Sequence, residues 1–135
     1  MLERTRPVKK DRFSTYLRKA EEFFIEMKHA ESEARWNAAS LNGIHCVISS
    51  ADALSVAFLG LRSAGQRHEN AEQLIRKTGV PGCDEKAKQF LQVTNWKTLV
   101  EYSDEEPSEK DARRMVLQSE RFFSWVKSVF APSHK

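Results

Sequence analysis

The sequence predicts an all-α protein, built as an antiparallel, up-and-down bundle of four or five helices. Glycine and proline are scarce, with 5 and 4 among 135 residues. Apolar residues recur at spacings of three and four along most of the chain, and no stretch alternates as a half-buried strand does. The length suits one domain with a single core, which we place at residues 13–131.

The first 12 residues are distinguished by their charge. They hold five basic and two acidic side chains, which accounts for the whole formal net charge of +3. The rest of the chain is formally neutral, unlike a protein that grips long nucleic acid through many phosphates. We expect residues 1–12 to form a disordered basic arm, either a solubilising tail or a loose contact for phosphate or a membrane surface. Residues 132–135 are expected to be a short tail.

A first helix is expected over residues 13–33, because large and small apolar side chains repeat there at helical spacing. The members of this stripe are Phe13, Leu17, Ala20, Phe24 and Met27, broadened by Tyr16 and Phe23. Trp36 and Asn37 then indicate a break. Asn37 is a candidate N-cap for the next helix, and Trp36 can pack on Leu41 as a hydrophobic staple.

A second helix is expected over residues 38–61, with three distinct faces. Its apolar seam consists of Ile44, Val47, Ala51, Leu54, Phe58 and Leu61, and its small-residue face of Cys46, Ser50, Ala53, Ala57 and Gly60. A helix that is apolar or small over most of its circumference is contacted on several sides. The sequence therefore places this helix at the centre of the bundle.

Three further helices complete the prediction. A short one covers residues 68–77 and ends at the Gly79-Val80-Pro81-Gly82 stop. Asp84 can cap a helix that runs to residue 101. Ser108 and Asp111 resemble a capping box that opens the last helix, whose apolar face continues to Phe130.

The polar face of the central helix carries the main candidate site. His45, Ser49 and Asp52 stand at i, i+4 and i+7, so their side chains cluster. A buried aspartate is costly unless it is paired. One interpretation is a buried network satisfied by residues such as Trp36, Trp96 or Tyr102, and the other is a ligand pocket that can be built on such a network.

Motifs for common chemistries are not found in the sequence. It lacks a P-loop, a dinucleotide-binding glycine fingerprint, an H-E-x-x-H motif and a G-x-S-x-G motif. The four histidines are scattered, so we expect no metal site and no cofactor. Cys46 and Cys83 lack C-x-x-C spacing, and we expect one buried thiol and one loop thiol in a reducing compartment. Without a long apolar run or a secretory signal, the expected location is cytoplasmic, with no membrane span.

Most of the chain, from Tyr16 to Val129, resembles the HEPN domains, which are small all-helical domains of prokaryotic toxin systems and nucleotide-binding modules. The matching pieces are residues 16–20 (YLRKA), 36–39 (WNAA), 50–54 (SADAL), 60–65 (GLRSAG) with His68 after them, 97–102 (KTLVEY), 111–112 (DA) and 120–122 (ERF). The order and spacing of these pieces carry the resemblance. It implies a helical bundle that often forms a two-fold dimer with a cleft at the interface.

The resemblance also implies where a nuclease site would lie. Ribonuclease members carry an Arg-x4–6-His motif late in the fourth helix, and these positions fall on Lys97 and Tyr102 here, with Asp52 as the polar residue from the second helix. Both motif residues depart from the pattern. Lysine lacks the planar grip of arginine on phosphate, and tyrosine is a poor proton shuttle at neutral pH. Lys97 can instead lie at a helix edge beside Trp96, and Tyr102 can be a core aromatic.

Three functional hypotheses follow, in order of preference. The first is a non-catalytic binding module for a nucleotide, a short RNA or a partner protein. The second is a dimeric interaction protein of a toxin–antitoxin type, with a partner such as a nucleotidyltransferase, and the third is a divergent metal-independent ribonuclease. The candidate binding residues are His45, Ser49, Asp52, Lys97, Tyr102 and a basic loop group of Arg62, Arg67 and His68, for which an ordinary exposed loop is the alternative.

A homodimer is expected from the large aromatic residues outside the predicted core. These residues are Phe23, Trp96, Phe123 and Trp125. They exceed what a small monomer readily buries.

Overall fold

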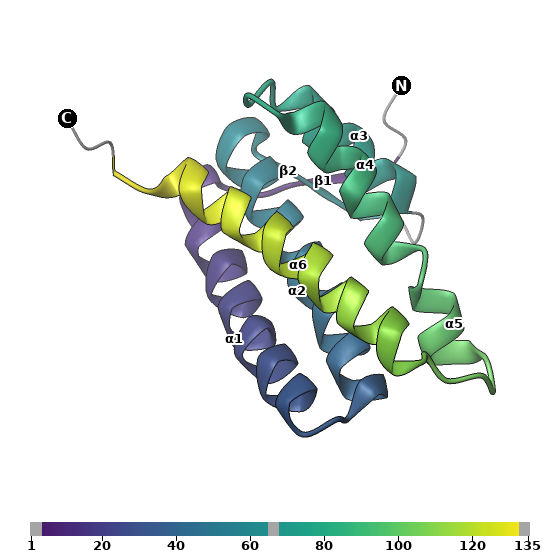
Figure 1. Cartoon of the computed structure of the whole chain (residues 1–135). Coiled ribbons are helices and arrows are strands. Elements are labelled where there is room, and N and C mark those ends of the chain that lie inside the picture. The colour runs from purple at the N-terminus through teal and green to yellow at the C-terminus, as the bar shows by residue number, and fades with distance from the viewer. Residues whose placement is uncertain (1–3, 65–67, 133–135) are drawn as a thin grey trace.

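The computed structural model describes residues 4–64 and 68–132, apart from the side chain of Tyr102. It confirms an all-α helical bundle, with one small two-stranded ribbon added (Figure 1). The elements in chain order are β1 (Thr5–Pro7), a 3₁₀ turn (Lys10–Arg12), α1 (Phe13–Ser32), α2 (Trp36–Leu59), β2 (Leu61–Ser63), α3 (His68–Lys77), α4 (Cys83–Thr94), α5 (Lys97–Tyr102) and α6 (Glu109–Phe130).

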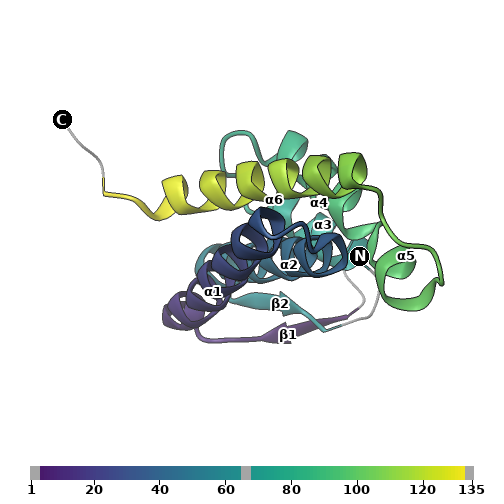
Figure 2. The ribbon, with the colours of Figure 1, turned by 60° about the horizontal axis from the view of Figure 1, so that its bottom comes forward.

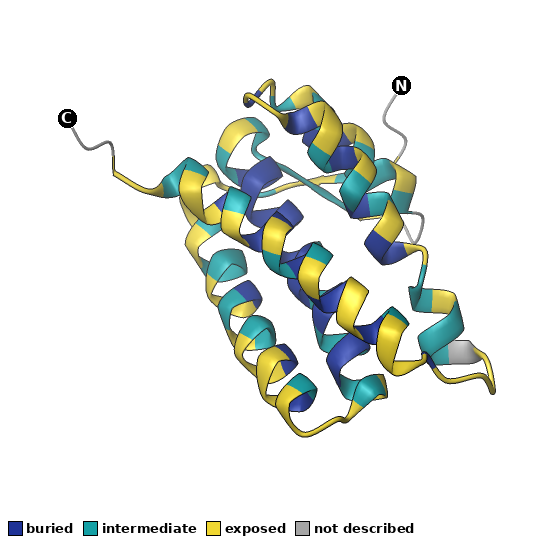
Figure 3. Ribbon diagram, in the orientation of Figure 1, coloured by how far each residue is buried: buried dark blue, intermediate teal, exposed yellow. Residues whose placement is uncertain are grey.

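Helix α2 is the centre of the molecule, as predicted. It contacts α1, α3, α4, α5 and α6, and it also contacts β2 and the 3₁₀ turn. Figure 3 shows that most of α2 is buried, whereas α1 and α6 keep exposed outer faces. The predicted seam is buried from Ile44 to Leu54, but Phe58 is 42% exposed near the end of the helix.

The small residues of α2 allow close packing at Gly43. A Cβ atom on Gly43 would lie 2.9 Å from the Ser119 Oγ on α6 and 3.2 Å from the Met27 Sδ on α1. Three helices therefore converge at a position where only glycine fits without a shift of its neighbours. The hydroxyls of Ser40 and Ser119 are buried there without a hydrogen-bond partner among the described residues.

Both ends of α2 and the end of the fourth helix differ from the prediction, since α2 ends at Leu59 and not at residue 61. Helix α2 begins at Trp36 rather than after Asn37, because Ala34 turns the chain with a φ of 59°. The Asn37 side chain does not cap the helix, and its Nδ2 donates to Glu106 Oε1 at 2.9 Å instead. The expected long fourth helix is split into α4 and α5 at Asn95 and Trp96.

The split between α4 and α5 has a local cause. Thr94 Oγ1 donates to the Phe90 carbonyl at 2.9 Å, and the Trp96 amide donates to the Val93 carbonyl, three residues back. Such bonds tighten and end an α-helix. At α6 the prediction is confirmed, since the Ser108 side chain accepts a hydrogen bond from the Asp111 amide at 3.1 Å.

The basic N-terminal segment is ordered, so the expectation of a disordered arm is wrong for residues 5–12. β1 pairs antiparallel with β2 in a register that sets Thr5 opposite Ser63, Arg6 opposite Arg62 and Pro7 opposite Leu61. The pairing starts where Gly60 ends α2 with a φ of 66° and turns the chain back. Figure 2 shows this ribbon beneath the α1–α2 pair, with β2 nearer to α2 and β1 outside.

The structure bears on two expectations, the absence of a membrane span and the homodimer. Helix α2 is long and apolar enough to cross a membrane by length and composition, but 67% of its most apolar window is buried inside the protein, as in a soluble core helix. Phe123, one of the aromatics behind the homodimer prediction, is only 2% exposed, and Phe23, Trp96 and Trp125 are half-buried. These aromatics therefore do not support a dimer, which stays a prediction.

Candidate functional site

A pocket of about 400 Å³ lies along the groove between α1 and α2 and is bounded by β2. Its lining residues are Tyr16, Lys19, Glu22 and Phe23 from α1, His45, Ile48, Ser49 and Asp52 from α2, and Arg62 from β2. The structure thus places the predicted trio His45, Ser49 and Asp52 along one wall of a single pocket. The volume falls in the usual range for small-molecule sites, roughly 300–1,000 Å³.

Asp52 and Arg62 form the ionic end of this pocket. Arg62 Nε donates to Asp52 Oδ2 at 3.2 Å, and Asp52 is only 7% exposed. Burial raises the pKa of the Asp52 carboxyl to about 6, against the opposing effect of Arg62 and, to a smaller degree, of Lys19. The sequence suggested Trp36, Trp96 or Tyr102 as partners. The structure gives Arg62 this role, and no hydrogen bond joins Asp52 to Trp36 or Trp96 within the described part of the chain.

The two cations at the ionic end, Arg62 and Lys19, both lie close to the Tyr16 ring. The Arg62 Cζ lies 5.3 Å from the centroid of the Tyr16 ring, and the Lys19 Nζ lies 5.5 Å from it. Arg62 is therefore held by a carboxylate and an aromatic ring together. These two contacts restrict the motion of the Arg62 guanidinium, so that a ligand bound to it loses less conformational entropy on binding.

Phe23 and His45 form the aromatic end of the pocket. Their rings stack with centroids 5.3 Å apart and an interplanar angle of 29°. Burial lowers the pKa of His45, although Glu101 Oε1 lies 3.8 Å from its Nε2 and acts in the opposite direction. Both the Tyr16–Phe23 and the Asp52–His45 spacing are seven residues along a helix, so the two ends of the pocket are about 10 Å apart.

Lys97 and His68 lie outside this pocket. Lys97 Nζ is 4.0 Å from Glu101 Oε2, the carboxylate that also approaches His45, and the positive charge of Lys97 helps to lower the pKa of His45. Burial lowers the pKa of His68, and nearby Lys97 lowers it further. The nuclease set expected from the resemblance is thus divided: Asp52 lines the pocket and Lys97 does not.

Two of the predicted site residues cannot be placed. The side chain of Tyr102 and the whole of Arg67 lie outside the described part of the chain. Arg62, which the sequence grouped with Arg67 and His68, belongs instead to the pocket with Asp52.

Sequence reasoning missed the wall that α1 contributes. Tyr16, Lys19 and Phe23 stand at i, i+3 and i+7, the spacing of one helix face. That spacing was a usable signal, but Tyr16 and Phe23 fitted the broadened apolar stripe equally well. Lys19 fitted an ordinary solvated face.

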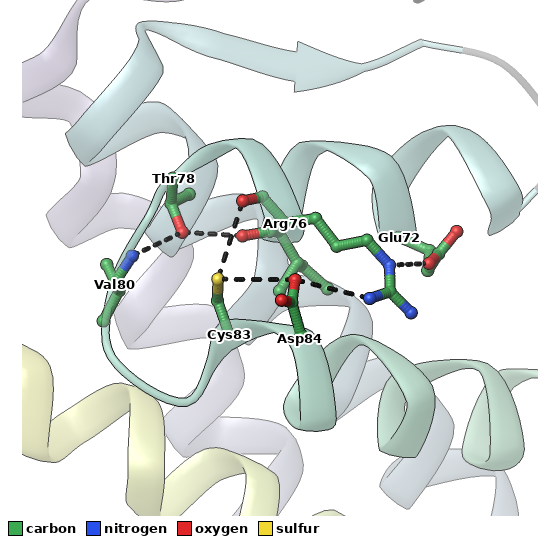
Figure 4. Close-up of polar contacts among 7 residues, drawn as sticks. Glu72, Arg76, Thr78, Val80, Cys83 and Asp84 are labelled. Atoms are coloured by element: carbon green, nitrogen blue, oxygen red, sulfur yellow. Dashed lines mark hydrogen bonds and ion pairs between the residues drawn. The ribbon is translucent and has the colours of Figure 1, made fainter.

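Both cysteines are buried and lie in helices, so the expectation of one loop thiol is wrong. Burial raises the pKa of the Cys46 thiol to about 12. Cys83 is the first residue of α4, and its Sγ donates to the Arg76 carbonyl at 3.5 Å (Figure 4). In the same view the Arg76 guanidinium also donates hydrogen bonds to the carboxylates of Glu72 and Asp84. The bond to Asp84 joins the end of α3 to the start of α4.

Metal binding finds no support in the described residues. Within 4–64 and 68–132, no three His, Cys, Asp or Glu side chains are placed to hold one ion.

The comparisons with known proteins leave the family open. No model of a known protein family matches the sequence, and no curated protein sequence matches it significantly. The resemblance to HEPN domains stays a prediction. Function must therefore be inferred from the pocket itself.

Proposed function

We propose that the protein is a non-catalytic binding module that takes a nucleotide, free or at the end of a short RNA, in the α1–α2 pocket. The observation that carries this proposal is the pairing of two unlike ends in one pocket. The stacked Phe23 and His45 rings form one end, and Lys19 and Arg62 form the other, about 10 Å away.

Each end suits one part of a nucleotide. A nucleobase stacks on flat side chains, and this contact is worth about 1–3 kcal/mol per base. A phosphate is bound by lysine and arginine, and arginine offers a planar fork of N–H donors. Ser49 lies on the wall that also carries His45 and Asp52, where its hydroxyl can meet a sugar.

The described pocket favours binding over phosphodiester cleavage. A general base must lie within hydrogen-bond reach of the proton that it removes. At the phosphate end Asp52 is already paired with Arg62, and Lys97 is outside the pocket. His45, which can accept a proton, lies at the aromatic end.

Isothermal titration of the full chain with mononucleotides, nucleosides and short RNAs tests the proposal. We expect mononucleotides to bind, and we expect Lys19→Gln to weaken this binding about fivefold, since one charge-assisted contact is lost. Arg18→Gln is the matched control, because it removes one exposed positive charge two residues from Tyr16, where the helix faces away from the pocket. Failure of every mononucleotide and RNA to bind would overturn the proposal.

A further inference from the structure

We infer that the N-terminal strand completes this pocket: Arg6 on β1 joins Arg62 on β2 and Lys19 on α1 in a site for a phosphate monoester. The inference deepens the proposed function, on which it rests for the identity of the whole ligand. It assigns a recognition role to a segment that the sequence alone presented as a loose tail.

The register of the ribbon places the two arginines together. Arg6 and Arg62 are directly opposed Cα partners in an antiparallel pair, so their side chains share one face of the ribbon. Opposed residues have Cβ atoms about 4.5–5.5 Å apart, and like charges at this distance destabilise the pair. Because Arg62 reaches into the pocket towards Asp52, this shared face puts Arg6 on the pocket side of the ribbon, beyond the residues that line the pocket.

The donors of both arginines remain largely unused. Arg62 bonds Asp52 through Nε alone, so among the described residues its terminal N–H groups have no hydrogen-bond acceptor. The Arg6 side chain is exposed and forms no hydrogen bond or ion pair with another side chain in residues 4–64 and 68–132; only the Arg6 backbone is paired, in the ribbon. Two guanidinium groups on one face, one of them fixed by Asp52 and Tyr16, can surround an oxyanion from two directions.

The charge of the site fits a phosphate monoester. Arg6, Lys19 and Arg62 supply three positive charges, and Asp52 and Glu22 supply two negative charges at most. A phosphate monoester carries about −1.5 to −2 charges at pH 7, and the net positive charge of the site offsets part of this charge. The ligand would also remove the repulsion between the two opposed arginines.

Calorimetric titration of the full chain with adenosine monophosphate and with adenosine tests this inference. We expect Arg6→Gln to weaken the binding of adenosine monophosphate about three- to tenfold, which is the effect of one charge-assisted contact at an exposed site. The same substitution should leave the binding of adenosine unchanged. Arg18→Gln again controls for the loss of one charge and should alter neither ligand. Equal effects of the two substitutions on adenosine monophosphate would overturn the inference.

A second titration separates this inference from the proposed function. Inorganic phosphate alone is added to isotope-labelled protein, and amide shifts are followed at Thr5, Arg6 and residues 61–63. If these amides shift in the wild type and not in Arg6→Gln, the anion site stands even where no nucleotide binds. If nucleotides bind but these amides do not respond to phosphate, the anion site is excluded while the pocket remains.

RNA ends distinguish the two sources of the phosphate. A short RNA with a 5′-phosphate should bind more tightly than the same RNA with a 5′-hydroxyl if the ligand is an RNA end. A preference for free adenosine monophosphate over both RNAs would assign the site to a small nucleotide. In either case, raising the salt concentration should weaken binding more in the wild type than in Arg6→Gln, since fewer charges are screened in the variant.

Discussion

Asp52 is the residue on which the pocket depends most. It lies on the most buried helix and is 7% exposed, and Arg62 is its hydrogen-bond partner at 3.2 Å. The other charged or titratable groups that line the pocket with it are Tyr16, Lys19 and Glu22 on α1 and His45 on its own helix. A buried, paired carboxylate costs stability, but it holds a cation in a fixed position. A binding site needs such a fixed cation, whereas a hydrophobic core does not.

The raised pKa of Asp52 predicts a pH dependence of stability. Between its unfolded pKa of 3.8 and its folded pKa of about 6, the folded protein keeps the proton that the unfolded chain has lost. The free energy of unfolding therefore contains a contribution that is complete below pH 3.8 and is lost as the pH rises through 6, by about 3 kcal/mol in all.

Urea denaturation at several pH values checks this. Relative to wild type, Asp52→Asn should gain stability between pH 3.5 and 7, because it lacks the ionisation. Asp104→Asn, which changes an exposed carboxyl, should keep the wild-type pH profile. Parallel wild-type and Asp52→Asn profiles across this range would contradict the assignment.

Gly43 and Ser119 provide a second prediction, on packing. Gly43→Ala places a Cβ 2.9 Å from the Ser119 Oγ, and this overpacking should outweigh the better helix propensity of alanine and cost about 1 kcal/mol. Ser119→Ala removes a buried hydroxyl without a partner among the described residues and should stabilise the protein by about 1 kcal/mol.

The double variant isolates the contact between these two residues. In the Ser119→Ala background the clash is gone, so Gly43→Ala should become neutral or stabilising. Chemical denaturation of the four proteins measures the coupling. The same cost for Gly43→Ala in both backgrounds would show that Met27, and not Ser119, limits the space.

At the scale of the elements, the sequence predicted what local chemistry determines. The bounds of α3 agree with the prediction, and α1 differs by one residue, because apolar periodicity and stop signals lie within each segment. The break between α4 and α5 was missed because Asn95 and Trp96 include neither glycine nor proline. There the apolar pattern continues across the turn, and a threonine side chain ends the helix instead.

The ribbon and half of the pocket could not be predicted from local sequence patterns. Strands of three residues are too short to show alternation, and β1 exists only because β2 lies beside it more than fifty residues later. His45, Ser49 and Asp52 were found because they share one helix. Tyr16, Lys19 and Phe23 face them from another helix, and only the pairing of α1 with α2 shows that they belong together.

The start of α6 gives a prediction for a single element. Ser108 is the N-cap, with its side chain accepting from the Asp111 amide, so Ser108→Ala should cost about 1 kcal/mol. Ser124→Ala, on the exposed face of the same helix, should change stability by no more than about 0.5 kcal/mol. Thermal unfolding of both variants measures the difference, and equal melting temperatures would show that the cap does not contribute.

At the scale of the whole molecule, the N-terminal basic segment and the helical core have different roles, because the segment takes no part in the buried core. All residues of the three buried apolar clusters lie between Ala20 and Val126, so β1 adds nothing to the core. The ribbon instead lies beneath the α1–α2 pair (Figure 2), and its strand β2 carries Arg62, the partner of the buried Asp52 carboxylate. In the proposed anion site, Arg6 brings part of the excess positive charge of the N-terminal segment to the edge of the pocket.

Removal of residues 2–8 tests this separation of roles. The truncated chain should keep its helical circular dichroism and unfold cooperatively, with a melting temperature lower by about 3–4 °C, the shift that corresponds to roughly 1 kcal/mol in a domain of this size. Its affinity for adenosine monophosphate should fall at least as far as that of Arg6→Gln, because Arg62 also loses the strand that faces it. A loss of cooperative unfolding would instead make β1 a part of the fold, since the helices alone could then not hold α2 in place.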